Sequence, residues 1–271
     1  MKASQSLLSA YPPREARALY LLVMEKAFGL NATQVLTGKD KELSADKQAL
    51  LQNIISRLVR KEPVQYILGQ ADFCGHIFHI EPGVLIPRPE TQELVSLINR
   101  QHPIPCSVLD IGTGSGCIAV SLALTGHQVT AFDISPDALR IARGNAQTLL
   151  ANVLFKQEDI LHPSVTTQLW DVIVSNPPYI CQKEAALMDG NVLDYEPHLA
   201  LFVPDNDPLL FYRAIAMYAL EHLNSHGCLY FEINEAYPTE TSSLLEQIGY
   251  HQITVHPDNY GKPRFISALK E

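Results

Sequence analysis

The sequence has no long apolar run, no excess of basic residues and few cysteines, and each absence argues against a class of protein. No stretch reaches the length of about 20 apolar residues that spans a membrane, and the start has too short an apolar run for a signal peptide. The net charge of −9 provides no basic surface for duplex nucleic acid. The five cysteines are widely spaced without a C-x-x-C pair, which predicts neither a disulfide framework nor a metal site. We therefore expect a soluble cytoplasmic protein that binds neither membranes nor nucleic acid directly.

The length of 271 residues and a change of pattern along the chain indicate two units joined by a linker. Hydrophobic residues make up 46% of the chain, which is enough for a sizeable core. Residues 1–72 are expected to form a small helical bundle, residues 73–88 a β-hairpin linker, and residues 89–271 an α/β domain.

The first part of the chain carries the apolar spacing of helices. One set of apolar residues recurs at helical intervals: Leu50, Leu51, Ile54, Ile55, Leu58 and Val59. Asn31 followed by Gln34 has the spacing of a capping box, and Pro12 and Pro13 suit the entry to a helix. This part is either a stabilising appendage or a docking surface for a partner, and its residues favour neither.

The stretch SVLDIGTGSGCIAVSLA, residues 107–123, indicates a buried strand, a glycine turn and a helix. Its glycines at positions 112, 114 and 116 let the backbone come close to a ligand at the helix N-terminus. The next expected strand, residues 128–133, ends in Asp133, which lies 21 residues after Gly112 and where a carboxylate would bind a ribose diol. The alternation of strands and helices predicts a parallel, right-handed sheet.

Four residues, Asn176, Pro177, Pro178 and Tyr179, follow an expected apolar strand, residues 171–175. They therefore lie at the carboxyl end of a strand, where open α/β sheets bind ligands. The two prolines fix φ at their own positions and hold the preceding residue extended. A planar amide placed there would meet two acceptors, the Asn176 side-chain oxygen and the Pro177 carbonyl oxygen, while Tyr179 would offer a flat face for stacking. A plain Pro-Pro turn that closes a strand is the alternative.

Asp159 and Ile160 follow the third expected strand, residues 153–156. Asp159 would accept a hydrogen bond from an adenine amino group there, and Ile160 would pack against the ring. A helix cap or a turn acid is an equally good interpretation of Asp159.

Two proline-rich segments complete the candidate site. Arg88 lies in IPRPE, which is either a bend before a helix or a lip of the site. Residues 181–208, which contain Glu196, are polar and broken by prolines, so we expect a long loop that covers a substrate.

Together these motifs resemble the S-adenosylmethionine-dependent methyltransferases that act on amide or exocyclic amino nitrogens. Four further segments make the chain resemble the release factor glutamine methyltransferases, also called the PrmC or HemK family: EPVQYILG (62–69), LIPRPET (85–91), EPHLAL (196–201) and DNYGKPRF (258–265). The resemblance is dense from residue 60 onward. The chain departs from the family pattern at Gln92, where glutamate is common, at Ile160, where an aromatic residue is common, and at residues 203–209, where a glycine-rich loop is common.

The resemblance implies a Rossmann-like class I methyltransferase fold, α/β with a mostly parallel seven-stranded sheet, preceded by a small N-terminal helical bundle. It implies transfer of a methyl group from S-adenosyl-L-methionine to the glutamine side-chain nitrogen in the Gly-Gly-Gln loop of peptide chain release factors, the expected partners. It assigns catalysis to Asn176, Pro177, Pro178 and Tyr179, cofactor binding to Gly112, Thr113, Gly114, Ser115, Gly116, Asp133, Asp159, Ile160 and Asn176, and substrate binding to the same four catalytic residues with Arg88 and Glu196. The alternatives are methylation of a glutamine in a ribosomal protein, adenine-N6 methylation of nucleic acid, and a cofactor-binding docking module without catalysis.

The chemistry of an amide explains why two fixed acceptors are useful. An amide nitrogen is a poor nucleophile because its lone pair is delocalised into the carbonyl. Two acceptors that bind both N–H bonds shift electron density to the nitrogen and aim its lone pair at the methyl group, so alignment supplies much of the rate. No strong general base is required, because the nitrogen becomes acidic only after it has bonded to the methyl group.

Overall fold

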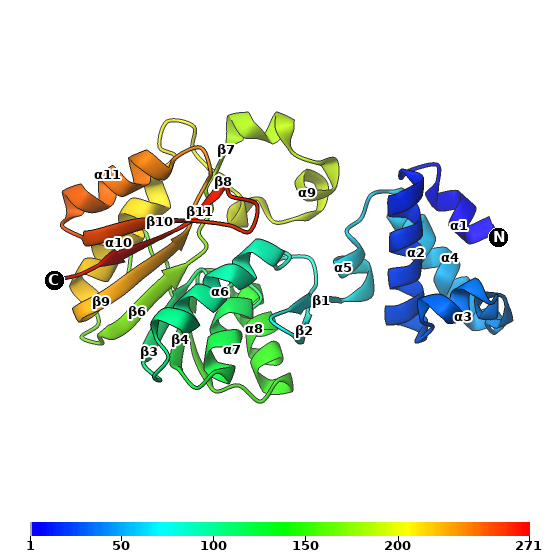
Figure 1. Ribbon diagram of the computed structural model, residues 1–271, viewed down its shortest axis with the longest axis horizontal. Helices are drawn as coiled ribbons and strands as arrows, with labels where there is room; N and C mark the ends of the chain where they lie inside the picture. Colours follow the sequence, from blue (N-terminus) through cyan, green and yellow to red (C-terminus); the bar gives the residue numbers. More distant parts are fainter. Residues whose placement is uncertain (1) are drawn as a thin grey trace. The chain divides into compact units, whose positions relative to one another are not determined.

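The structure is a computed structural model that describes residues 2–271, with every side chain except those of residues 2–4 and 187 (Figure 1). It divides into two compact units. The helical unit comprises the chain up to Gln70 together with Met188–Tyr195, and the sheet unit comprises Ala71–Leu187 and Glu196–Glu271. The segment Met188–Tyr195 was expected in the α/β domain, so its place in the helical unit corrects that expectation.

The helical unit contains seven short or medium helices: α1 (Lys2–Leu7), α2 (Pro13–Phe28), α3 (Ala32–Leu36), η1 (Lys39–Glu42), α4 (Ala45–Val59), α5 (Val64–Leu68) and α9 (Gly190–Tyr195). Apolar side chains from α1, α2 and α4 form its core, among them Leu7, Met24 and Leu58. The Tyr195 hydroxyl donates to the Arg60 carbonyl at 3.0 Å, which ties α9 to the end of α4. This contact joins segments that are far apart in the sequence.

Two details of the helical unit can be compared with the sequence. The capping box is present, because Gln34 N donates to Asn31 Oδ1 and Asn31 N donates to Gln34 Oε1, both at 2.9 Å. Leu50, expected on the buried face of its helix, is instead 49% exposed. The buried stripe of α4 consists of Leu51, Ile54, Ile55 and Leu58.

The sheet unit is built on a seven-stranded sheet with the order β10-β11-β9-β6-β3-β4-β5. Its strands are β3 (Ser107–Ile111), β4 (Gln128–Asp133), β5 (Val153–Gln157), β6 (Trp170–Ser175), β9 (Leu223–Glu232), β10 (His251–Pro257) and β11 (Pro263–Leu269). Strand β11 runs antiparallel to its neighbours β9 and β10, and the other pairs are parallel. The mostly parallel seven-stranded sheet is therefore confirmed. Strand β3 pairs with β4 on one side and β6 on the other, which places the switch in strand order, and the expected ligand crevice, at its carboxyl end.

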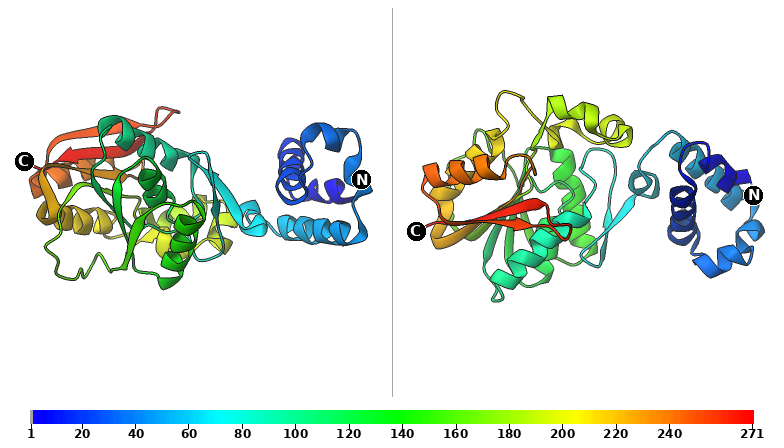
Figure 2. Two further views of the ribbon diagram at one scale, coloured as in Figure 1. Left: turned by 90° about the horizontal axis from the view of Figure 1, so that it is seen from below. Right: turned by 45° about the horizontal axis from the view of Figure 1, so that its top comes forward.

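Helices cover both faces of the sheet (Figures 1 and 2). Helices α6 (Pro89–Gln101), α7 (Cys117–Leu124) and α8 (Pro136–Thr148) lie on one face, and α10 (Leu210–His222) and α11 (Pro238–Ile248) on the other. The second face buries Tyr212 and Ile215 of α10 against Leu109, Ile173 and Phe231 of the sheet. None of the helices that the structure describes is both long and apolar enough to cross a membrane.

Two segments of the chain lie outside the main sheet, and one strand of the main sheet is longer than expected. Strands β1 (Gln70–Phe73) and β2 (His76–His79) form a two-stranded sheet, which starts earlier than the hairpin expected in residues 73–88. The segment expected to be one long loop instead contains η2 (Gln182–Leu187), α9, η3 (His198–Ala200) and a parallel pair of β7 (Ile180–Cys181) with β8 (Phe202–Val203). Strand β9 starts at Leu223, earlier than the expected residue 227.

Candidate active site

A cavity of about 370 Å³ opens at the carboxyl ends of β3, β4 and β6. Most of the residues expected at the site line it: Arg88, Gly112, Thr113, Gly114, Ser115, Asp133, Asp159, Ile160, Asn176, Pro177 and Pro178. Gly116, Tyr179 and Glu196 are not among the lining residues. Their positions show how the wall of the cavity is held in place.

The glycine loop, residues 112–116, is held by its backbone. Gly112 N and Thr113 N both donate to the Phe132 carbonyl at 2.9 Å, which binds the loop to the neighbouring strand β4. Gly112 and Gly114 have φ of 75° and 55°, and a Cβ on either would meet no atom within 4 Å. The missing side chains therefore leave open space on the cavity side of this loop.

Gly116 has a packing role instead of a lining role. Its φ is 80°, and a Cβ there would lie 3.0 Å from the Cβ of Ala142 on α8. The absence of a side chain lets α7 and α8 approach at the point where α7 begins. A direct contact of Gly116 with the cofactor therefore stays a prediction.

Asp133, at the end of β4, accepts two backbone hydrogen bonds. Gly114 N donates to Oδ2 at 2.8 Å, and Ser135 N donates to Oδ1 at 2.9 Å. Burial raises the pKa of Asp133, and the bonds from Ser135 and Gly114 oppose this shift. A carboxylate has about four lone-pair positions, so each oxygen keeps capacity for one more donor.

Two further residues, whose roles the sequence does not predict, hold the glycine loop in place through side-chain hydrogen bonds. Asp110 is fully buried and accepts the Thr113 hydroxyl at 2.7 Å. Burial raises the pKa of Asp110 to about 7. Asn145 on α8 donates to the Ser115 carbonyl at 2.9 Å and to the His79 carbonyl at 3.0 Å, so it ties the loop to β2.

Both carboxylate oxygens of Asp159 make contacts within its own turn. Its Oδ1 accepts Leu161 N, and its Oδ2 contacts His162 Nδ1, both at 2.9 Å. These contacts fit the interpretation of Asp159 as a turn acid, and a bond to an adenine amino group stays a prediction. Ile160 lines the cavity and packs against the core of the sheet unit, so it provides an apolar surface where the family often has an aromatic residue.

The Asn-Pro-Pro-Tyr segment follows β6, and its first three residues line the cavity. Among the contacts of the described residues, none provides a donor to Asn176 Oδ1 or to the Pro177 carbonyl oxygen. The amide nitrogen of Asn176 lies 3.4 Å from Thr91 Oγ1. Asn176 and Pro177 both line the cavity, and the contact of their two acceptors with a substrate amide stays a prediction.

Tyr179 points away from the cavity. Its hydroxyl donates to Glu232 Oε1 at 3.1 Å, its ring packs against the core, and burial raises its pKa. The expected stacking of this ring on a substrate amide stays a prediction. The structure shows Tyr179 as an anchor that fastens the end of the Asn-Pro-Pro-Tyr segment.

Arg88 and Glu196 form an ion pair. Glu196 Oε1 accepts from the Arg88 guanidinium at 2.6 Å, and Oε2 accepts from Ile86 N at 3.1 Å. The Glu196 side chain is only 1% exposed and does not line the cavity. Glu196 therefore positions Arg88 and the IPRPE bend, and this corrects the expectation that it contacts the substrate.

Comparison with known proteins identifies the family. A model described as the PrmC N-terminal domain matches residues 1–69, and one described as a methyltransferase domain matches residues 105–206. A release factor glutamine methyltransferase from Bacteroides thetaiotaomicron is 50% identical over 267 residues, which cover 97% of this chain and 96% of the relative. The chain belongs to the release factor glutamine methyltransferase family. Another member, from Flavobacterium psychrophilum, is 40% identical over 97% of this chain and 95% of its own length.

Solved structures support the same fold at lower identity. A methyltransferase from Pyrococcus furiosus has a TM-score of 0.56 and 17% identity, and covers 84% of this chain and 99% of its own. The 16S rRNA methyltransferase RsmC of Thermus thermophilus has a TM-score of 0.55 and 19% identity over 74% of this chain and 50% of its own. As a member of the family, the protein is an S-adenosylmethionine-dependent methyltransferase.

The residues present fit this cofactor. The open space beside Gly112 and Gly114 accommodates a ligand that a Cβ would displace, and Asp133 keeps acceptor capacity beside it. Ile160 adds an apolar surface for a base. The cofactor would therefore occupy the half of the cavity between β3 and β4.

Proposed function

We propose that this protein methylates the side-chain amide nitrogen of a glutamine in the Gly-Gly-Gln loop of a peptide chain release factor. The observation that carries the proposal is the pair of acceptors, Asn176 Oδ1 and the Pro177 carbonyl, which have no protein donor among the described residues and border the cavity beside the glycine loop. A primary amide has two N–H bonds, so this pair matches its donors. The names of the relatives support release factors as the substrate class.

The residues of this chain orient the substrate amide for methyl transfer. When bound, S-adenosylmethionine supplies a methyl group on a sulfonium sulfur. Asn176 Oδ1 and the Pro177 carbonyl oxygen accept hydrogen bonds from the two amide N–H groups. These bonds draw electron density toward the nitrogen and fix the plane of the amide. Each proline holds the residue before it extended, which restricts the backbone at Asn176 and at Pro177 and limits the reorganisation needed as the nitrogen reacts.

The proposed mechanism requires no strong general base. No histidine is among the described residues that line the cavity, burial raises the pKa of the Cys117 thiol to about 12, and the carboxylates in the lining are Asp133, Glu158 and Asp159. The methylated nitrogen is acidic enough to lose its proton to water or to a weak acceptor. A site that works by alignment requires a substrate loop that reaches the strand ends, and glycines beside the glutamine would pass the rigid prolines without Cβ clashes.

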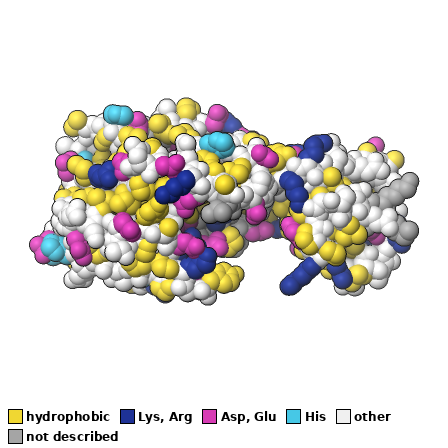
Figure 3. All heavy atoms as spheres, turned by 90° about the horizontal axis from the view of Figure 1, so that it is seen from above, with side chains coloured by type: hydrophobic (Ala, Val, Ile, Leu, Met, Phe, Trp, Pro, Cys, Tyr) yellow, Lys and Arg dark blue, Asp and Glu magenta, His cyan; other side chains and the backbone are white. Residues whose placement is uncertain are grey.

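The helical unit is suited to bind the body of the release factor. Residues 1–70 contain ten Lys or Arg and six Asp or Glu, whereas the remaining residues contain ten and 23. Lys and Arg side chains appear at several places on the helical unit (Figure 3). This contrast fits an acidic surface on the partner, because complementary charge accelerates association and selects partners.

Methyl transfer with labelled cofactor tests the activity. The substrates are intact release factor, the same factor with the loop glutamine changed to alanine, a peptide carrying only the loop, and DNA. We expect a high kcat/KM only for the intact release factor, because contacts away from the loop help to place the glutamine in the site. Equal transfer to the alanine variant, or transfer to DNA only, would contradict the proposal.

The docking role has a matched pair of variants on α2. Arg14 and Arg17 are exposed and one turn apart, and Glu15 is exposed beside them. Changing both arginines to glutamate should raise KM for intact release factor severalfold, whereas Glu15→Lys should not raise it. Neither change should alter activity on the loop peptide, and an equal rise of KM for that peptide would exclude docking by α2.

A further inference from the structure

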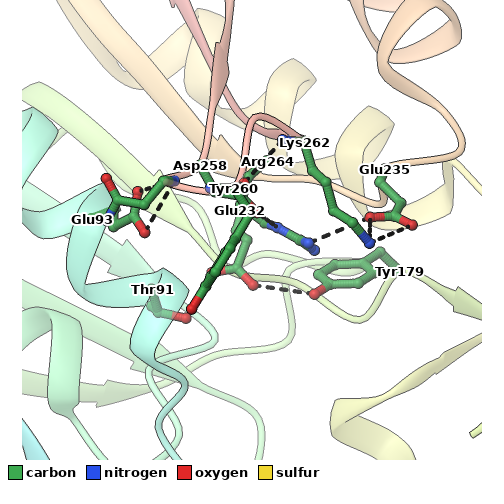
Figure 4. A network of polar contacts seen from close by, with 10 residues as sticks. Thr91, Glu93, Tyr179, Glu232, Glu235, Asp258, Tyr260, Lys262 and Arg264 are labelled. Carbon is green, nitrogen blue, oxygen red and sulfur yellow. Dashed lines mark hydrogen bonds and ion pairs between the residues drawn. The ribbon is translucent and has the colours of Figure 1, made fainter.

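The buried carboxylate of Glu232 connects three separate segments (Figure 4). Glu232 ends β9 and is 2% exposed. Its Oε2 accepts the hydroxyl of Thr91, in the first turn of α6, at 2.7 Å. Its Oε1 accepts the hydroxyl of Tyr179 at 3.1 Å. One carboxylate therefore binds both α6 and the end of the Asn-Pro-Pro-Tyr segment.

The bond from Thr91 determines how the Asn176 amide is turned. The Thr91 hydroxyl proton is used in the short bond to Glu232, so its oxygen offers only lone pairs to other groups. Asn176 Nδ2 lies 3.4 Å from that oxygen and is the donor. A reversed amide would place Asn176 Oδ1 against these lone pairs, so Oδ1 is the atom left for the cavity. The contact is long, as hydrogen bonds often are before substrate binds.

The C-terminal DNYGKPRF segment helps to keep Glu232 ionised. Burial raises the pKa of Glu232, and the bonds from Thr91 and Tyr179 and the positive charge of Arg264 oppose this shift. Arg264 Nε donates to Asp258 Oδ2 at 3.3 Å, and the Asp258 side chain is 1% exposed. Glu232 accepts one hydroxyl on each carboxyl oxygen, a pattern that an ionised carboxylate provides.

We propose that Thr91 and Glu232 are positioning residues that keep Asn176 Oδ1 turned toward the cavity beside the Pro177 carbonyl and so select a carboxamide over a carboxylate. The inference rests on the proposed function. A glutamine side chain gives N–H donors to Asn176 Oδ1 and the Pro177 carbonyl. A glutamate side chain would place a charged oxygen against two acceptor oxygens, which costs binding free energy at this site.

The first test removes the Thr91 hydroxyl and uses a matched control. Thr91→Val lacks the bond to Glu232, Thr91→Ser keeps it, and Thr241→Val is the control. Thr241 is buried in the first turn of α11, donates to the Tyr237 carbonyl at 2.7 Å and does not line the cavity. We expect Thr91→Val to lower kcat for release factor about 10- to 100-fold, with KM and cofactor affinity within about twofold of those of wild type.

Two results would support the positioning role within this test. Thr91→Ser should restore kcat to within about threefold of wild type, and Thr241→Val should leave kcat unchanged even if it lowers the melting temperature as much as Thr91→Val does. If the valine methyl prevents folding beside Glu232, Thr91→Ala repeats the measurement. A kcat for Thr91→Val or Thr91→Ala that matches that of Thr241→Val would overturn the proposal.

The second test measures selectivity directly. Release factor with the loop glutamine changed to glutamate serves as a competitive inhibitor of methylation. We expect its Ki to fall about tenfold in Thr91→Val relative to wild type, because the freed Asn176 amide can turn its nitrogen toward the carboxylate. An unchanged Ki would refute the selectivity role. Failure of wild type to methylate any release factor while it binds the cofactor would instead refute the proposed function.

Discussion

The glycine loop and the Asn-Pro-Pro-Tyr segment both follow strands of the same parallel sheet, yet they are held by different kinds of contact. The glycine loop is fixed by backbone bonds to the next strand, through the Phe132 carbonyl and Asp133. The Asn-Pro-Pro-Tyr segment is fixed by side chains that are 85 and 53 residues away in sequence, Thr91 and Glu232. The cofactor half is thus held by residues 19 to 30 positions away in the sequence, and the substrate half by residues 53 to 85 positions away.

This difference implies that the two halves can be damaged separately. A change in the glycine loop or Asp133 should weaken cofactor binding and leave the orientation of the acceptors intact. A change at Asn176 or its supports should slow methyl transfer and leave cofactor binding intact. The following variants test that separation.

The largest effect is expected from Asn176→Ala. It removes one of the two acceptors that align the substrate amide, and loss of a comparable preorganised group lowers kcat by about 10²- to 10³-fold. The free energy of unfolding should change by less than about 1 kcal/mol, because the side chain makes only one long bond, at 3.4 Å. Single-turnover rates at saturating cofactor measure the effect, and near wild-type turnover would exclude the two-acceptor mechanism.

Asp133→Ala should weaken cofactor affinity by about 1.5 to 3 kcal/mol, since it removes a charged acceptor. It also leaves Gly114 N and Ser135 N without the acceptor that they have now. Calorimetric titration with the cofactor gives the affinity. Unchanged affinity would remove Asp133 from the cofactor site.

Asp110 should make the free energy of unfolding of the protein depend on pH. Its pKa is about 7 in the folded protein and about 4 in an unfolded chain, so between these values unfolding releases a proton. Stability from this group is therefore lost as the pH rises from about 4 to about 7. We expect wild type to lose at least about 1.4 kcal/mol more than Asp110→Asn between pH 5 and pH 7 in urea unfolding. Parallel pH profiles of the two proteins would show that Asp110 is ionised throughout.

The smallest effects distinguish two glycines of one loop. Gly114→Ala and Gly116→Ala both place a side chain at positive φ, which costs about 1 to 2 kcal/mol of stability. Only the Gly114 side chain would enter the open space of the cavity, and only the Gly116 side chain would press on Ala142. Gly114→Ala should therefore lose more cofactor affinity, and Gly116→Ala more thermal stability. The reverse pattern would place the cofactor elsewhere.

Local patterns explain why much of the fold could be predicted. The apolar run before each motif predicts a buried strand, and the capping box at Asn31 depends on residues three positions apart. The departure at Gln92 has a structural outcome of its own, since its side chain on α6 accepts Cys74 N at 2.9 Å in the turn between β1 and β2. The two acceptors of the substrate half likewise follow from two consecutive prolines.

Long-range contacts explain what could not be predicted. Thr91 ends the LIPRPET segment and Glu232 lies in no motif, and their roles exist only because the start of α6 meets the ends of β6 and β9. Glu196 was expected to contact the substrate. It pairs instead with Arg88, which lies 108 residues away in the sequence, and so supports the cavity without lining it. The short helices between residues 181 and 208 depend on tertiary contacts such as Tyr195 with Arg60.

The most direct test of this account measures two properties on the same two variants. Cofactor dissociation constants and single-turnover methylation rates at saturating cofactor are determined for Asp133→Ala and Asn176→Ala with intact release factor. We expect a crossed result, in which Asp133→Ala loses affinity but keeps most of its rate, and Asn176→Ala keeps affinity but loses its rate. If both variants lose the same property, the two halves of the cavity do not have separate functions and the account is wrong.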